Sequence, residues 1–232
     1  MPARIENSLD SALLEELKGL TPREIVTTLC EARTTPMVPE IRTYLSSEAH
    51  RFWRQGEEAM QSYPFGMPFW GIPWAGGLGL ARWIIDNPQV VSGKSVWCFA
   101  AGAGIEAIAA RHAGAADVTV NDIDPVACAA AKLNAELNAV VVQTSDSDKV
   151  GDSLDGVDVL LAGDFCYDEE LSERVFSWLE QLLDAGIEVY VGDPGRVFLQ
   201  KERLHTVWRG KAEPGHDYDD PDVRRAGVFR FL

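Results

Sequence analysis

Apolar strands alternate with helices along most of this chain. Residues 96–100 form a strand that is apolar on both faces, and a turn of alanine and glycine then leads into a helix at 104–110. Further strands are expected at 118–122, 140–143, 157–163 and 187–192, with helices at 126–137 and 169–183. Strands of this kind, joined by helices, are typical of a parallel sheet with helices packed on both sides. The pattern therefore predicts an α/β fold with a doubly wound, mostly parallel sheet.

Two segments near the end of the chain alternate between apolar and polar residues. They span 204–209 and 227–232 and flank an acidic loop at 216–222. Alternation with a period of two is typical of strands, and two such strands can pair as an antiparallel hairpin. We expect this hairpin at the edge of the sheet, which then has seven strands.

The first 62 residues are predicted to be mainly helical and to form an extension in front of a domain that spans 63–232. Leucines at helical spacing over 9–17 indicate a first helix. The sequence Thr-Pro-Arg-Glu at 21–24 supplies the capping threonine, proline and glutamate that start a second helix. A third helix is expected over 43–60. The extension either caps the sheet edge or forms a lid that recognises a substrate.

A loop rich in aromatic residues, glycine and proline precedes the first strand of the sheet. It spans 64–77, where we expect no helix, and a helix follows at 80–85. The loop carries more apolar area than a solvent-exposed loop normally shows. We expect it to pass over the ligand end of the sheet as the wall of a pocket; the alternative is a hydrophobic plug.

The acidity of the chain narrows the range of its partners. It carries 36 aspartate and glutamate residues against 21 lysine and arginine residues, a formal net charge of −15. This balance repels nucleic-acid phosphates and anionic membrane surfaces, and it favours encounter with a basic protein or peptide. Solubility alone explains the acidity equally well. We expect neither nucleic acid nor membrane among the partners.

Cysteine and histidine usage gives no sign of a metal site or of disulfide bonds. The cysteines at 30, 98, 128 and 166 lack the Cys-x-x-Cys spacing of zinc sites, and the histidines form no cluster. No run of about 18 apolar residues indicates a membrane span. The first residues lack the apolar core of a signal peptide, so a cytoplasmic location is the simplest expectation.

Residues at the ends of the predicted strands indicate a ligand site. The turn 100–104 consists of small residues, which let a ligand approach the backbone closely. Asp122 ends the next strand about 20 residues later, where an acidic residue commonly accepts the hydroxyl groups of a ribose. Asp164 and Tyr167 are polar residues directly after the apolar fourth strand. Doubly wound sheets bind ligands beyond these carboxyl ends, so all three features belong to one expected site.

The order of elements, with a set of short motifs, resembles the class I, seven-stranded S-adenosylmethionine-dependent methyltransferases, whose fold is Rossmann-like. More narrowly, the chain resembles the electron transfer flavoprotein β-subunit lysine methyltransferases, including bacterial members. The matching motifs lie at 38–42, 68–70, 74–77, 86–88, 93–96, 121–125, 163–167 and 192–196. The Asp-Pro-Gly-Arg turn at 193–196 is the most specific of them.

This resemblance implies a protein-lysine N-methyltransferase that uses S-adenosylmethionine and releases S-adenosylhomocysteine. Its partner would be a protein substrate, the electron transfer flavoprotein β subunit or a similar basic site. Two alternatives stay open: a small-molecule N-methyltransferase, and a non-catalytic interaction module that has kept the methyltransferase fold.

The resemblance also implies roles for individual positions. The cofactor-binding residues would be Trp74, Gly76, Ala100, Gly102, Gly104, Asp122, Ile123, Asp146 and Gly163, with Asp122 on the ribose hydroxyls and Asp146 near the adenine amine. The catalytic residues facing the methyl group would be Asp164 and Tyr167, and the substrate residues would be Phe69, Trp70, Asp193 and Arg196. Asp193 and Arg196 either orient the substrate or bond each other to brace their turn.

One motif departs from the family pattern. The family's first strand normally ends in an acidic residue followed by Gly-x-Gly-x-Gly, but this chain has Cys98 at the acidic position and Ala100 at the first glycine. In the superfamily that acid helps to hold the methionine end of the cofactor. Its absence either weakens cofactor binding or requires another polar group to replace it.

Overall fold

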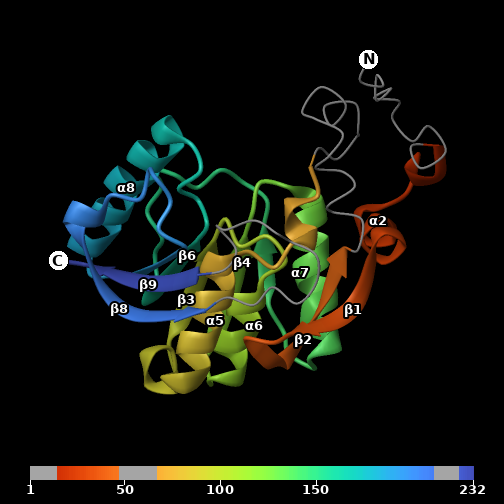
Figure 1. The fold of residues 1–232 in the computed structure, drawn as a ribbon, viewed down its shortest axis with the longest axis horizontal. Helices are drawn as coiled ribbons and strands as arrows, with labels where there is room; N and C mark the ends of the chain where they lie inside the picture. Colours follow the sequence, from red (N-terminus) through yellow and green to blue (C-terminus); the bar gives the residue numbers. More distant parts are fainter. Residues whose placement is uncertain (1–14, 47–66, 212–224) are drawn as a thin grey trace, which may run out of the picture.

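The computed structural model, which describes residues 15–46, 67–211 and 225–232, has a sheet of seven strands at its centre (Figure 1). The strands are β3 (Ser95–Phe99), β4 (Asp117–Asn121), β5 (Gln143–Ser145), β6 (Val159–Gly163), β7 (Glu188–Asp193), β8 (Leu204–Lys211) and β9 (Arg225–Phe231). Their order is β5-β4-β3-β6-β7-β9-β8. The first five run parallel, and β9 pairs antiparallel with β7 and β8. The predicted α/β fold and its C-terminal hairpin are confirmed.

Helices cover both faces of this sheet. On one face lie α5 (Ala75–Asp86), α6 (Ile105–His112) and α7 (Pro125–Leu137), and on the other lies α8 (Glu169–Asp184). Residues along β3 alternate between the two cores: Cys98 packs with α5 and α6, whereas Phe99 packs with α8. This double burial is why the strands read as apolar throughout. Among the described residues, no helix has the length and apolar character that a membrane crossing requires.

A helix and a hairpin precede the sheet. α2 (Pro22–Leu29) starts with the predicted capping box, in which the Thr21 side chain accepts from Glu24 N, and Thr21 N donates to Glu24 Oε2 at 2.8 Å. β1 (Cys30–Thr35) and β2 (Val38–Ser46) then pair antiparallel. In front of α2, residues 15–17 are helical, and the rest of the first predicted helix lies outside the described residues.

The expectation of a mainly helical extension is wrong for the hairpin. The third helix was predicted from residue 43, but 43–46 belong to β2, and 47–60 and the boundary at 62 lie outside the described residues. Burial along β2 explains the difference, because Ile41, Thr43 and Leu45 are buried at every second position. This period is that of a strand, and it outweighs the helical spacing that Leu45 makes with later residues.

The start of α5 also differs from the prediction, because the loop expected over 64–77 contains helix. A short 3-10 helix, η1 (Phe69–Gly71), is followed by α5, whose first turn includes Gly76 and Gly77. A Cβ atom on Gly76 would overlap the carbonyl oxygen of Gly192 and lie 2.5 Å from Asp164 Oδ2. Glycine here serves close packing of α5 against the strand ends and not a turn.

The third predicted strand is displaced along the chain. It was expected at 140–143, whereas β5 begins at Gln143 and ends at Ser145. After α7 the chain turns through Ala139, which has φ +54°, and Val140 and Val142 pack against the core before β5 starts. The apolar run thus belongs to the connection. Two other short 3-10 segments are η2 (Pro88–Val90) and η3 (Lys201–Arg203).

Two asparagines on α7 join the hairpin to the sheet domain. Asn134, which is fully buried, accepts from the backbone N–H of Tyr44 at 2.7 Å and donates to the carbonyl oxygen of Ala103 at 3.0 Å. One turn further on, Asn138 accepts from Arg42 N at 3.0 Å and donates to Arg42 O at 2.6 Å. Asn134 therefore links β2 to the turn after β3.

We expect Asn134→Leu to lower the free energy of unfolding by about 3 kcal/mol, because two buried backbone groups lose their partners at about 1–3 kcal/mol each. Urea denaturation followed by circular dichroism measures the change. The control is Lys132→Leu, an exposed position on the same helix, which we expect to change stability by less than about 0.5 kcal/mol. Equal stability of the two variants would contradict this role of Asn134.

Candidate functional site

Two residues at the carboxyl ends of adjacent strands have an unusual backbone conformation. Ala100, after β3, has φ +50°, and Asp164, after β6, has φ +57°. The left-handed region costs a residue with a Cβ atom roughly 1–2 kcal/mol. Such residues persist where surrounding contacts hold them, and they cluster at ligand sites. Because β3 and β6 are neighbours, the two turns lie side by side.

The turn after β3 is held by Asp122 from the end of β4. Asp122 Oδ2 accepts from the backbone N–H of Gly102 at 2.8 Å, and its Oδ1 accepts from Asp124 N at 3.0 Å. Burial raises the pKa of Asp122, and these two hydrogen bonds oppose the rise. Asp124 caps α7 through Val126 N at 2.7 Å, which leaves Asp122 available for the turn.

The other small residues of the site allow close approach of backbone. Gly102 and Gly104 have φ +49° and +71°, and a Cβ atom on Gly104 would lie 3.2–3.3 Å from side chains of α7 and β4. Gly163, the last residue of β6, faces Gly77 of α5, whose nitrogen would be 3.2 Å from an added Cβ atom. The glycines thus bring the start of α5 and the start of α6 down onto the strand ends.

Asp164 is the centre of a buried charged network. Its Oδ1 accepts from Arg196 Nη1 at 2.7 Å, and its Oδ2 accepts from the backbone N–H of Gly77 at 2.8 Å. Burial raises the pKa of Asp164, and the Arg196 guanidinium opposes this rise. The carboxylate therefore binds one of the unpaired N–H groups in the first turn of α5, where the helix dipole favours negative charge.

Asp193 and Arg196 brace the turn that follows β7. The fully buried Asp193 accepts at Oδ1 from the backbone N–H groups of Gly195 and Arg196, at 2.6 and 2.7 Å. Its Oδ2 lies 3.2 Å from Arg196 Nη1. The structure thus shows the bracing contacts that the sequence left as one of two alternatives. Contact of Arg196 with a substrate stays a prediction, since its side chain is 11% exposed.

Trp74 lies between this charged network and the aromatic segment. The Arg196 guanidinium carbon is 5.8 Å from the centre of the Trp74 ring, within the range of a cation–π contact. Trp74 Nε1 donates to the carbonyl oxygen of Phe69 at 2.9 Å, and the two rings are 6.2 Å apart. The segment before α5 is therefore positioned over the strand ends, as a pocket wall would be.

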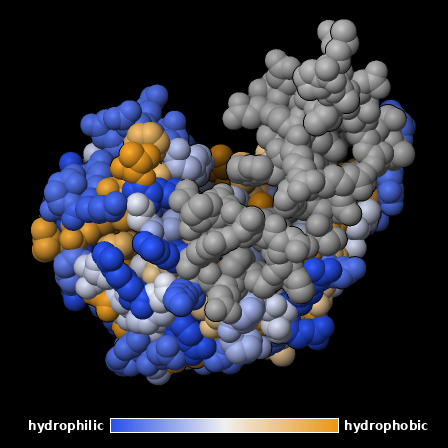
Figure 2. All heavy atoms as spheres, viewed as in Figure 1, coloured by the Kyte–Doolittle hydropathy of each residue, from blue (hydrophilic) through white to orange (hydrophobic). Residues whose placement is uncertain are grey.

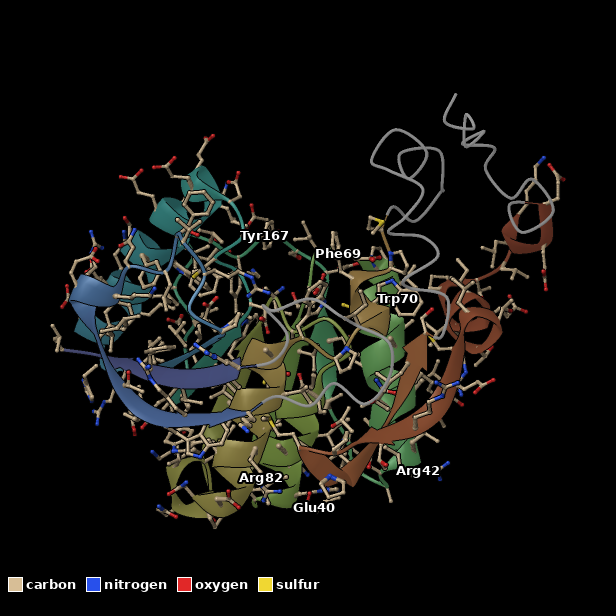
Figure 3. The ribbon with its side chains drawn as sticks, in the orientation of Figure 1. Glu40, Arg42, Phe69, Trp70, Arg82 and Tyr167 are labelled. Atoms are coloured by element: carbon tan, nitrogen blue, oxygen red, sulfur yellow. The ribbon has the colours of Figure 1, made fainter. Side chains whose placement is uncertain are left out.

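Tyr167 and Phe69 are the exposed aromatic side chains of this region. Tyr167 is 67% exposed and Phe69 is 50% exposed, and both are labelled on the upper side of the molecule in Figure 3. The space-filling view has a hollow on this side with apolar atoms in it (Figure 2). Tyr167 follows β6 and Phe69 precedes α5, and two exposed aromatic rings in this region suit contact with a substrate chain.

The three remaining residues predicted for the site differ in burial: two are exposed and one is buried in the core. Ile123 is 72% exposed directly after Asp122, and Asp146 is exposed after β5. Trp70, expected to face the substrate, is instead only 1% exposed and packs with residues of α2 and α7. The structure places the Trp70 ring in the core, because it fills the space between the hairpin and α7.

Glu106 is a buried acidic residue that the sequence pattern did not predict to belong to the site. It is the second residue of α6 and is only 1% exposed. Burial, opposed by a hydrogen bond from its own backbone N–H and reinforced by the charges of Asp164 and Asp122, raises its pKa to about 8. The available signal was a single acidic residue inside the apolar sequence Ile-Glu-Ala-Ile-Ala-Ala after the glycine turn.

Comparison with known families and structures identifies methyltransferases, the class of protein that the sequence motifs resemble. Residues 84–163 match the family model described as ribosomal protein L11 methyltransferase (PrmA). A putative RNA methyltransferase from Pyrococcus horikoshii has a similar structure, with a TM-score of 0.50 and 16% identity over 67% of this chain and 81% of that one. This likeness shows the class I methyltransferase fold.

Curated relatives are closer in sequence. The electron transfer flavoprotein β-subunit lysine methyltransferase of Xenopus laevis is 40% identical over 75% of this chain and 71% of its own length. The protein of the same name from Danio rerio is 41% identical over 72% of this chain, and the match spans 65% of its length, slightly less than two thirds. With these relatives on the same fold, the chain belongs to the family of electron transfer flavoprotein β-subunit lysine methyltransferases.

Proposed function

We propose that this protein transfers methyl groups from S-adenosylmethionine to a lysine side chain of the electron transfer flavoprotein β subunit or a similar protein. The relatives at 40–41% identity carry this substrate in their names. The observation that carries the proposal is the set of carboxylates at the ends of β4, β6 and β7: Asp122, Asp164 and Asp193. Arg196 offsets part of their charge, so the site favours positively charged ligands.

The residues present fit S-adenosylmethionine. The turn after β3 consists of alanine and glycine over 100–104, so it presents backbone and no large side chain to a ligand. Asp122 lies where the ribose hydroxyls bind in doubly wound folds, and the exposed Ile123 beside it provides an apolar surface for the adenine. When bound, the cofactor supplies a methyl group that its positively charged sulfur has already activated.

The protein's own contribution is to position the acceptor nitrogen and release its proton. A lysine in water has a pKa of about 10.4 and is protonated, so the ammonium must lose a proton to the solvent before the nitrogen attacks. Asp164 supplies negative charge beside the acceptor, and Tyr167 and Phe69 pack along its apolar stem. The buried carboxylates attract the ammonium, and the apolar wall removes water and favours its neutral form. Positioning of this kind is worth roughly 7–11 kcal/mol of the barrier.

Mass spectrometry tests the activity directly. Purified protein is incubated with S-adenosylmethionine and recombinant electron transfer flavoprotein β subunit, and we expect the subunit to gain mass in steps of one methyl group on lysine. The matched control is Asp122→Ala, which we expect to lower methylation at least tenfold because a charged hydrogen-bond partner of the ribose is lost. An unmodified subunit, together with methylation of a small amine, would favour the small-molecule alternative.

A further inference from the structure

The Glu106 carboxylate has no hydrogen-bond or ion-pair partner among the described side chains. It is buried in the first turn of α6 and is 1% exposed. The hydrogen bond that its carboxylate accepts comes from the backbone N–H of Glu106 itself. A buried carboxylate without a cationic or multiple hydrogen-bond partner is unfavourable for folding. The ionised form of Glu106 therefore requires a positively charged partner from outside the described side chains.

Glu106 lies beside Cys98, the residue that stands where the resembling family has an acid. Cys98 is fully buried on the face of β3 that packs against α6. Burial raises the pKa of the Cys98 thiol, and the nearby Glu106 charge raises it further, so the thiol is neutral. β3 thus lacks the carboxylate at position 98, and α6, which packs on the same face of β3, carries the Glu106 carboxylate.

The surroundings of Glu106 place it at the inner end of the site. A Cβ atom on Gly77 would lie 3.4 Å from Glu106 Oε2, which puts the carboxylate beside the start of α5. Asp164 and Asp122, from the ends of β6 and β4, are close enough for their charges to raise its pKa. The exposed ring of Tyr167 marks the outer side. A cation beside Glu106 would thus belong to a ligand inside the site and not to an incoming lysine.

We propose that Glu106 replaces the missing strand acid and binds the α-ammonium of the methionine part of S-adenosylmethionine. The proposal rests on the proposed function. It explains the glycine at position 77, because a larger side chain there would fill the space next to the carboxylate. It also explains why Cys98 is tolerated: a second carboxylate at 98 would repel Glu106 across the same buried interface.

Binding should be linked to a proton. With a pKa raised to about 8, Glu106 is largely protonated at pH 7 in the free protein. An ammonium beside it favours the ionised form, so cofactor binding releases a proton and strengthens as the pH rises towards about 8. The titratable groups facing Glu106 are Asp164, Asp122 and Cys98.

Calorimetry with three probes tests the contact: S-adenosylmethionine, S-adenosylhomocysteine, which keeps the ammonium, and 5′-methylthioadenosine, which lacks the amino-acid part. We expect Glu106→Gln to weaken binding of the first two at least tenfold and to leave the third within about twofold. Titrations in two buffers of different ionisation enthalpy should show proton release at pH 7 in the native protein and less in the variant. Glu170→Gln, an exposed glutamate in the first turn of α8, is the matched control.

The outcomes separate the two proposals. If the native protein binds none of the three probes, the proposed function fails and this inference fails with it. If it binds them and Glu106→Gln binds equally well, or loses all three alike, only the role of Glu106 is overturned. The double variant Cys98→Asp with Glu106→Gln returns a carboxylate to the strand, and we expect it to recover most of the lost affinity. If a folded double variant did not recover affinity, the proposal that Glu106 replaces the acid at position 98 would be contradicted.

Discussion

Replacing Gly76 with alanine is expected to lower the free energy of unfolding by about 3 kcal/mol or more. The added methyl group would overlap the carbonyl oxygen of Gly192 and approach Asp164 Oδ2 to 2.5 Å. The first obstacle is backbone, which cannot move without shifting α5 away from β7. Overpacking of a well-packed interior costs typically about 1–3 kcal/mol, and this contact lies at the upper end. Chemical denaturation monitored by tryptophan fluorescence gives the value.

Gly77→Ala is the matched control one residue further along α5. Both glycines lie in the first turn of the same helix, but a Cβ atom on Gly77 meets its nearest neighbour at an ordinary 3.4 Å. Alanine is favoured over glycine in helices by about 1 kcal/mol, so this variant should be as stable as the native protein or more so. If Gly76→Ala were equally stable, the tight packing of α5 on the strand ends would be disproved.

The second large effect is expected for Asp164→Asn, which removes the charge and keeps the shape. We expect methyl transfer to the protein substrate to fall by roughly 100-fold or more, the size of effect seen when one preorganised electrostatic group is removed. Affinity for S-adenosylmethionine should change by less than about threefold, since we propose that the acceptor lysine, and not the cofactor, binds beside this carboxylate. Single-turnover rates and calorimetry measure the two quantities separately.

Asp193→Asn distinguishes catalysis from bracing. Asp164 and Asp193 both contact Arg196, so each substitution disturbs the same guanidinium. Asp193 is fully buried behind it. We therefore expect Asp193→Asn to lower stability while turnover of the folded protein drops much less than in Asp164→Asn. Equal losses of turnover would mean that Asp164 acts by holding Arg196 and Gly77 in place.

The sheet and the turn after β3 could be predicted because their signals are local. A fully apolar strand such as β6 must be buried on both faces, and the capping residues Thr21 and Asp124 mark the starts of α2 and α7. Asp122 was placed correctly beside the glycine turn, since the end of β4 always returns to that edge of the sheet. Position and spacing alone were sufficient for these elements.

Other features depend on contacts between distant segments, which no local pattern records. The helical turn at Gly76 exists because of Gly192, more than a hundred positions later. Trp70 is in the core because α2 and α7 enclose it, although its neighbours in sequence suggested a pocket wall. Glu106 was missed for the same reason: its burial between α5 and β3 appears only when the two are packed together.

Asn134 gives the N-terminal hairpin a part in shaping the glycine bend between β3 and α6. One amide group satisfies both Tyr44 N–H and the carbonyl of Ala103, two residues before Ile105 opens α6. A fragment cut to begin at the sheet would leave this amide half satisfied and the glycine bend without its outer support. The hairpin that precedes the sheet thus supports the bend that follows β3.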